Sequence, residues 1–339
     1  GQATILNDDG SPEALAAAMQ SGRPRLTGLR AMDGAGVCDG SQRLAEHFIP
    51  RKAQELYQRL KHLDLTTRLG DVADVGIGYV SGANAFFHLT EATVRQWEIP
   101  DGFLRPVVCK GRCLKGLRFT RDDWHEILRR DGPAFLLFVG SDRGEIPTGV
   151  RRYLEHGERL GVPNSFKCRT RSPWYCVPHV REPDALLTYM SGSSPRLVTN
   201  DASAVAPNNL HILKLHPITS LSGHALAALW QTSLTRLSVE LEGHALGGGM
   251  LKMEPTEAEN ALIPTGSAGN GKLESLAREL DTLLREGRDR VAQSLADREL
   301  LIGGLGISEK ACLSLRNAAE CLHARRYGRA RTAAASERH

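Results

Sequence analysis

The central part of the chain, residues 64–265, switches repeatedly between the hydrophobic period of a strand and that of a helix. Short apolar runs suit strands at 72–80, where glycines interrupt the pattern, and at 134–139. Helices are expected at 91–97, 124–129, 150–160 and 224–241, and the last of these has apolar residues at helical spacing. This part of the chain therefore suits a mixture of helices and strands.

Three local signals mark where helices of this central part begin or end. Thr90 is placed to cap the helix at 91–97. Thr120 and Asp123 have the spacing of a capping box, with Asp in place of the usual Glu, before the helix at 124–129. Gly161 suits the left-handed position that follows a helix ending at residue 160.

The two flanks differ from the centre. Residues 1–63 contain an expected strand at 2–6, a short helix at 11–19, a glycine-rich loop at 33–40 and a helix that Pro50 opens. After a linker-like GSAGNG segment at 266–271, a leucine stripe predicts a long helix that packs on the protein or a partner: Leu273, Leu276, Leu280, Leu283 and Leu284. A last helix is expected at 309–324. The arginines that follow are expected to form a solvated basic end, with nonspecific phosphate contact as the alternative: Arg325, Arg326, Arg329 and Arg331.

Composition limits the setting of the protein. Hydrophobic residues make up 41% and charged residues 24%, which excludes a chain disordered throughout. No apolar run is long enough to cross a membrane, so we expect no membrane partner. Seven cysteines, an odd number without a disulfide framework, indicate a reducing, cytoplasmic setting, and the Cys109–Cys113 pair is interpreted as buried thiols. The net charge of +4 is compatible with nucleic acid but does not by itself indicate it.

One candidate binding segment is the turn at residues 78–84 (GYVSGAN). Gly82 can adopt a positive φ next to Ser81, and the Asn84 amide can pair with an adenine edge or a phosphate. The alternative is a purely structural turn in which Asn84 bonds its own backbone. We predict Ser81, Gly82 and Asn84 to be DNA-binding residues.

Further candidate residues lie in two later segments. Lys167, Arg169 and Arg171 alternate, so on a strand they would share one face and would favour an anionic partner such as a phosphate backbone. Tyr175 would pack on sugar or base, whereas Trp174 suits the core. The glycine triplet at 247–249 would let the backbone approach a phosphate, with charge added by Lys252. From these segments we predict six further DNA-binding residues: Lys167, Arg169, Arg171, Tyr175, Gly248 and Lys252.

Four segments, in this order, resemble the C-terminal half of gamma-class N6-adenine DNA methyltransferases, which modify bacterial restriction sites. They are LGDVADVGIGYVSGANAFFHL at 69–89, YLEHGERLGVPNSFKCRTRSPWYCVPHV at 153–180, PRLVTN with NNLHIL within 195–213, and EGHALGGGMLKMEPTEAENALIP at 242–264. The resemblance implies an α+β fold with a mixed sheet and additional C-terminal helices. It also implies a target recognition domain that clamps double-stranded DNA against a separate catalytic domain. It divides the chain into 1–63, an edge of or linker from that catalytic domain, 64–265, the recognition domain, and 266–339, a helical region with a basic tail.

The catalytic motifs of such enzymes are not found in this sequence. The family's (N/D/S)-P-P-(Y/F) loop holds the flipped adenine, and this sequence contains no Pro-Pro dipeptide. The glycines at 34–36 follow no strand-like run, so no S-adenosylmethionine loop is expected. We expect no catalytic, cofactor-binding or metal-binding residue here. S-adenosylmethionine would serve the complete enzyme, whose catalytic domain is truncated from this chain or stands on another.

Two alternatives remain open from the sequence. The chain would be a metal-dependent nuclease or an atypical methyltransferase if carboxylates gathered into a metal site, with four candidates: Asp71, Asp74, Glu240 and Glu242. It would be a protein-interaction scaffold if the leucine stripe docked a partner. Sequence-specific recognition of duplex DNA is the function we expect.

Overall fold

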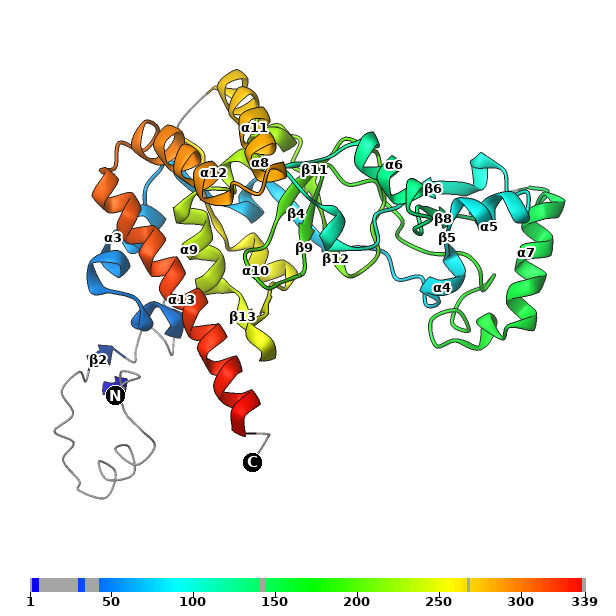
Figure 1. Cartoon of the computed structure of the whole chain (residues 1–339), viewed down its shortest axis with the longest axis horizontal. Helices are drawn as coiled ribbons and strands as arrows, with labels where there is room; N and C mark the ends of the chain where they lie inside the picture. Colours follow the sequence, from blue (N-terminus) through cyan, green and yellow to red (C-terminus); the bar gives the residue numbers. More distant parts are fainter. Residues whose placement is uncertain (1, 6–29, 34–42, 141–143, 267–268, 337–339) are drawn as a thin grey trace.

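The computed structural model describes residues 2–5, 30–33, 43–140, 144–266 and 269–336 (Figure 1). The predicted helix at 11–19 and most of the glycine-rich loop at 33–40 lie outside these residues. The described chain mixes helices with several small sheets and has the α+β fold that the sequence predicts. The predicted strand at 2–6 is β1 (Gln2–Ile5), which pairs antiparallel with β2 (Arg30–Asp33).

A five-stranded sheet forms the centre of the body. Its order is β4 (Ala73–Ile77), β12 (Leu210–Leu215), β9 (Ala185–Thr188), β11 (Leu197–Asn200) and β7 (Arg118–Phe119). Neighbours run antiparallel except β11 and β7, which are parallel. Two helices pack on the sheet, α8 (Gly223–Leu229) and α11 (Asn270–Arg285), and the predicted leucine stripe of α11 is buried there.

A second group of helices covers the other side of the body (Figure 1). It contains α3 (Arg51–Lys61), α9 (Ser233–Glu242), α12 (Asp289–Ala296) and α13 (Glu309–Ser336), with a π-helical turn at Asp297–Ile302. As the sequence predicts, α3 buries one apolar face: Ala53, Leu56, Tyr57 and Leu60. Two small sheets complete the body. One pairs β3 (Thr66–Arg68) with β15 (Leu262–Pro264). In the other, β14 (Leu251–Lys252) lies between β10 (Met190–Ser191) and β13 (His244–Ala245). Helix α10 (Pro255–Glu259) lies between β14 and β15 in the chain.

The insertion, residues 79–180, lies in the chain between β4 and β9. Most of it forms a lobe that extends from the body (Figure 1). The lobe contains the sheet β5 (His88–Leu89), β8 (Phe135–Leu137) and β6 (Leu104–Pro106), with helices α4 (Asn84–Phe87), α5 (Glu91–Gln96) and α7 (Thr148–Arg159). It has its own apolar core, centred on residues such as Phe87, Leu136 and Val150. The stretch around β7 and α6 (Arg121–Arg129) returns to the body.

Short 3₁₀ turns link these elements. They are η1 (Leu44–Phe48), η2 (Leu69–Asp71), η3 (Asp101–Phe103), η4 (Gly111–Cys113), η5 (Val162–Asn164) and η6 (Gly247–Gly249). Among the described residues, no helix is both long and apolar enough to span a membrane.

The predicted helix ends of the insertion are confirmed. The Thr90 hydroxyl accepts a hydrogen bond from the Thr93 N–H, and Thr120 and Asp123 form the capping box before α6. Gly161 follows α7 with a φ of 73°, the left-handed value expected there. These ends depend on side chains within a few residues, which is why they were predictable from sequence.

Two helix predictions are wrong. The stretch 224–241 is two helices, because the Thr232 hydroxyl accepts from the Thr235 N–H and starts a new helix after Trp230. The last helix continues to Ser336 instead of ending at 324, so the expected solvated tail lies largely on α13. Arg326, predicted to be solvated, is only 4% exposed. Its burial comes from a carboxylate on α9, which no local pattern reveals.

Candidate nucleic-acid interface

The turn at 78–84 and the basic segment at 167–171 lie against each other, although more than eighty residues separate them in the chain. The Arg171 guanidinium donates to the carbonyl oxygens of Ser81 (2.7 Å) and Val80 (2.5 Å). The Cys168 thiol also donates to the Ser81 carbonyl. The structure thus joins two candidate segments into one surface.

The prediction that the three cations share the face of a strand is wrong. Residues 167–172 form turns, because the segment closes on the 78–84 turn instead of pairing with a sheet. Arg171 is half-buried and its planar fork holds two backbone carbonyls. In this arrangement its guanidinium holds the turn in place, and its contact with a phosphate stays a prediction.

Lys167 and Arg169 are exposed and flank an exposed aromatic ring. Phe166 is 65% exposed, and the Lys167 ammonium and the Arg169 guanidinium lie 5.4 and 5.2 Å from its ring centroid. This spacing is that of a cation–π contact. Phe166 is not among the residues predicted from the sequence, although an aromatic residue beside alternating cations was the available signal.

Gly82 is required for this close approach. Its φ is +85°, as predicted, and a Cβ built on it would lie 2.7 Å from the Lys167 Cβ. Any other residue would therefore be strained at this position and would push the basic segment away.

Asn84 is exposed at the first position of α4. Its side-chain oxygen accepts a hydrogen bond from the Ser81 hydroxyl, which in turn accepts from the Ala83 N–H. Among the described residues the Asn84 amide nitrogen has no partner. Ser81, one of the predicted DNA-binding residues, is 1% exposed and orients Asn84 from beneath the surface.

Trp174 and Tyr175 are both half-buried. Trp174 packs against Phe86 and Phe87 at the edge of the lobe's core, close to the burial expected for it. Tyr175 stands edge-on to Trp174 at 5.7 Å and also packs on that core. The two rings thus attach the end of the basic segment to the core of the lobe.

The glycine triplet lies in the body, in a different part of the molecule from α4 (Figure 1). Gly248 is exposed, with a φ of +71° and open space around it. Lys252, predicted to add free charge here, is already paired with Glu254 at 2.5 Å and lies 5.4 Å from the Tyr189 ring centroid. The pairing arises because Glu254 follows two residues later at the strand end, so Glu254 offsets the charge that Lys252 adds beside the triplet.

Arg326 fixes this triplet from α13. Its guanidinium pairs with Glu240 at 2.9 Å and donates to the carbonyls of Gly192, Ser193 and Gly249. Both side chains of the ion pair are under 10% exposed. A buried charge needs this degree of pairing, so the predicted basic tail instead anchors a loop of the body.

The four carboxylates of the nuclease alternative do not gather. Glu240 pairs with Arg326, Glu242 with Arg43 and Asp74 with His216, while Asp71 caps η2. Among the described residues no group of three His, Cys, Asp or Glu side chains is placed to hold a metal ion. The proposed metal set is therefore wrong. Cys109 is half-buried, and burial raises the pKa of its thiol to about 12, which fits the predicted buried thiol.

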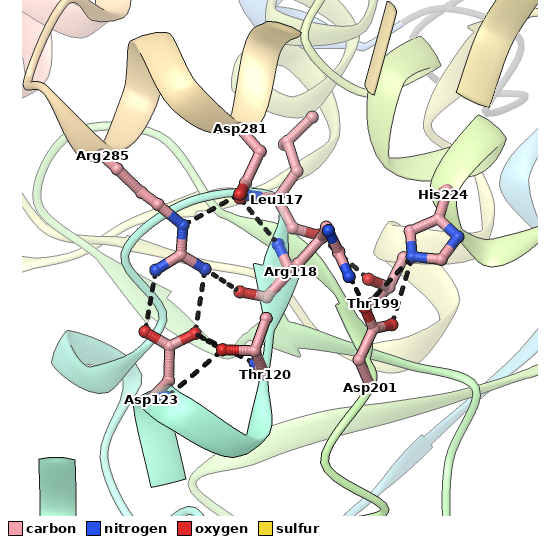
Figure 2. A network of polar contacts seen from close by, with 9 residues as sticks. All are labelled: Leu117, Arg118, Thr120, Asp123, Thr199, Asp201, His224, Asp281 and Arg285. Atoms are coloured by element: carbon pink, nitrogen blue, oxygen red, sulfur yellow. Dashed lines mark hydrogen bonds and ion pairs between the residues drawn. The ribbon is translucent and has the colours of Figure 1, made fainter. Parts of the chain in front are cut away.

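A polar network ties helix α11 to the segment around β7 (Figure 2). Arg285 binds Asp123 of α6 through two bonds of 2.8 and 2.9 Å. The Asp281 carboxylate accepts from the N–H groups of Leu117 (2.7 Å) and Arg118 (3.2 Å). The C-terminal helices therefore hold the base of the insertion, an attachment that the leucine stripe alone did not predict.

The same network continues to β11 and α8. Arg118 and His224 both bind the Asp201 carboxylate. Burial alone would raise the pKa of Asp201, but the hydrogen bonds from His224 and Arg118 outweigh it and lower the pKa to about 2.

Comparison with known proteins assigns the chain to a family. Residues 41–301 match the C-terminal domain of the type II methyltransferase M.Eco57I, and the chain belongs to this family of restriction–modification methyltransferase domains. It is 21% identical over 193 residues to the type II methyltransferase M.AccI of Acinetobacter calcoaceticus, covering 56% of this chain and 35% of that protein.

A solved structure shares the fold. The type IIG restriction endonuclease BpuSI matches 93% of this chain and 38% of its own length, with a TM-score of 0.54 and 15% sequence identity. The chain thus spans little more than a third of each of these relatives. At this identity the likeness to BpuSI shows the fold alone.

Proposed function

We propose that this chain reads the sequence of duplex DNA for a site-specific N6-adenine methyltransferase of a restriction–modification system. The observation that carries the proposal is the contact between Arg171 and the 78–84 turn. It sets an exposed amide, Asn84, beside two exposed cations, Lys167 and Arg169. An amide can pair with an adenine edge, and cations suit a phosphate backbone.

The distribution of charge supports a nucleic-acid partner for the insertion. Residues 79–180 contain 16 Lys and Arg against 11 Asp and Glu, whereas the rest of the chain contains 27 against 28. The positive charge of the whole chain therefore arises from the insertion. A concentrated charge of this kind attracts a polyanion more strongly than the net charge suggests.

Methyl transfer belongs, in this proposal, to a catalytic domain that also holds S-adenosylmethionine. The family's catalytic loop requires two adjacent prolines, and this sequence has none. That domain would be part of the same polypeptide or a separate subunit. We expect the chain alone to transfer no methyl group, and labelled S-adenosylmethionine with duplex DNA as acceptor measures this directly.

The scaffold alternative is weakened by one specific contact. The leucine stripe of α11 is buried against α8 inside the chain's own core, so it offers no free apolar face. A partner that needed the stripe would have to unfold this core first.

Selection from a pool of random duplexes tests the proposed function. The full chain is incubated with the pool at low salt, and bound duplexes are amplified and sequenced through repeated rounds. We expect one adenine-containing motif to be enriched, because the exposed amide discriminates between bases. A pool that stays random after binding, or a chain that binds no duplex, would remove DNA-sequence reading as its function.

A further inference from the structure

Three cationic residues lie within six residues of one another in the loop between β6 and β7, outside the interface described above. Lys110, Arg112 and Lys115 are exposed, and none of their side chains has a hydrogen bond or ion pair with another described residue. The body's Lys252 and Arg285, by contrast, are each paired with a carboxylate. Like charges so close in the chain repel one another unless an anion joins them.

The backbone that carries these cations is anchored from two sides. The Asn209 amide donates to the Cys109 carbonyl at the start of the loop. Arg196 donates to the carbonyls of Leu114 (2.9 Å) and Lys115 (2.8 Å) near its end. Between these anchors Leu114 is buried, at 1% exposure. The loop is therefore fixed by contacts that leave its three charged side chains free.

A third anchor lies directly after the loop. The Asp281 carboxylate binds the N–H of Leu117 (Figure 2), and a Cβ on Gly116 would lie 2.1 Å from its Oδ1 atom. Only glycine allows the chain to pass this carboxylate. A backbone held so firmly lowers the entropy lost when its side chains bind a partner.

The loop is continuous with the interface proposed for DNA. Besides holding Cys109, the 207–210 turn contacts the 78–84 turn, because the Asn208 N–H donates to the Tyr79 carbonyl (3.0 Å) and the Gly78 N–H to the Leu210 carbonyl (3.1 Å). Asn208 and Asn209 are exposed. Exposed amides thus lie between the basic loop and the turn that carries Asn84.

A cavity of about 370 Å³ opens beside the loop, and its charged lining consists of the three cations, Arg130 and two carboxylates, Asp123 and Glu126. Both carboxylates are already paired, Asp123 with Arg285 and Glu126 with Arg130. The three loop cations are therefore the charges at this cavity without a partner among the described residues, and such charges raise the local concentration of anions.

We propose that the basic loop, residues 110–115 (KGRCLK), is a second contact to the phosphate backbone of duplex DNA. This inference rests on the proposed function, since it extends the same interface across the 207–210 turn. Duplex DNA presents phosphates at regular spacing, so one molecule can meet both the basic loop and the Lys167–Arg169 pair. The loop adds affinity and register without reading bases.

The test measures the salt dependence of duplex binding by the full chain. A loop variant carries Lys110→Gln, Arg112→Gln and Lys115→Gln. Each lost phosphate contact lowers the slope of log K against log salt by about 0.9, so we expect a loss of roughly 2 to 3 units. The control variant removes three exposed cations of the body helices instead: Lys52→Gln, Lys272→Gln and Lys310→Gln. We expect it to keep the wild-type slope.

Lysine acetylation provides a readout that needs no variant. Duplex DNA should slow the acetylation of Lys110 and Lys115 at least several-fold, while Lys52 and Lys272 react at the same rate with and without DNA. If the wild-type chain binds duplex but the loop and control variants have equal slopes, or if DNA leaves Lys110 and Lys115 unprotected, the loop inference fails alone. If the wild-type chain binds no duplex, the proposed function fails with it.

Discussion

Substitutions of Arg171 test whether this residue contacts DNA directly or instead holds the 78–84 turn in the position that DNA contacts. The structure uses its guanidinium to hold the carbonyls of Val80 and Ser81. A hydrogen bond from a charged donor contributes about 1.5–3 kcal/mol, and a half-buried site favours the lower end. Arg171→Ala should therefore reduce the free energy of unfolding by roughly 3 kcal/mol and release the turn that carries Asn84.

The charge-preserving variant Arg171→Lys is the decisive one. A lysine ammonium lacks the planar fork that spans two carbonyls, so we expect it to recover less than half of the stability lost in Arg171→Ala. Duplex affinity should follow stability and not charge. Urea denaturation gives the free energy of unfolding, and fluorescence anisotropy with a labelled duplex gives the affinity.

Arg169→Ala is the matched control. Arg169 is exposed beside Phe166 and holds no backbone carbonyl, so its loss should leave stability nearly unchanged and lower the salt slope by about 0.9. Two results would refute the positioning role of Arg171. One is an alanine variant as stable as wild type, and the other is a lysine variant with full affinity and slope.

Other side chains yield sharper single tests. Asn84→Ala should cost roughly 1–3 kcal/mol on the selected motif and spare random duplex in competition binding, and equal losses on both would make Asn84 structural. Arg326→Met should lower the free energy of unfolding by about 3–5 kcal/mol in urea, because it leaves Glu240 buried without its partner. Adding Glu240→Gln should recover part of that loss, and no recovery would mean that the pair is not coupled. Burial lowers the pKa of His88 from 6.5 to about 4. Between pH 6.5 and 4 the His88 side chain therefore binds a proton in the unfolded chain but not in the folded chain. The free energy of unfolding should therefore fall as pH drops from about 6.5 to 4, and His88→Gln should flatten this dependence if His88 is its source.

Local chemistry made part of this protein predictable. The caps at Thr90 and Thr120, the left-handed Gly161 and the apolar faces of α3 and α11 depend on residues within a turn or two. The local patterns also predicted a mixture of strands and helices, while the α+β class came from the resemblance of four segments to a known family. Within 224–241 the apolar residues follow one helical period, but the N-cap at Thr232 starts a second helix. The prediction of a single helix failed for this reason.

The candidate segments followed from residue types, but their roles required the tertiary structure. The sequence alone determined that an asparagine on a glycine-containing turn, an alternating basic run and a glycine triplet were present. Only the fold decided that Arg171 closes onto Val80 and Ser81, that Lys252 is paired, and that Arg326 is buried. A cation is free or occupied according to which carboxylates and carbonyls come within about 3 Å of it. Those partners come from distant elements, because chain packing, not sequence spacing, sets that distance.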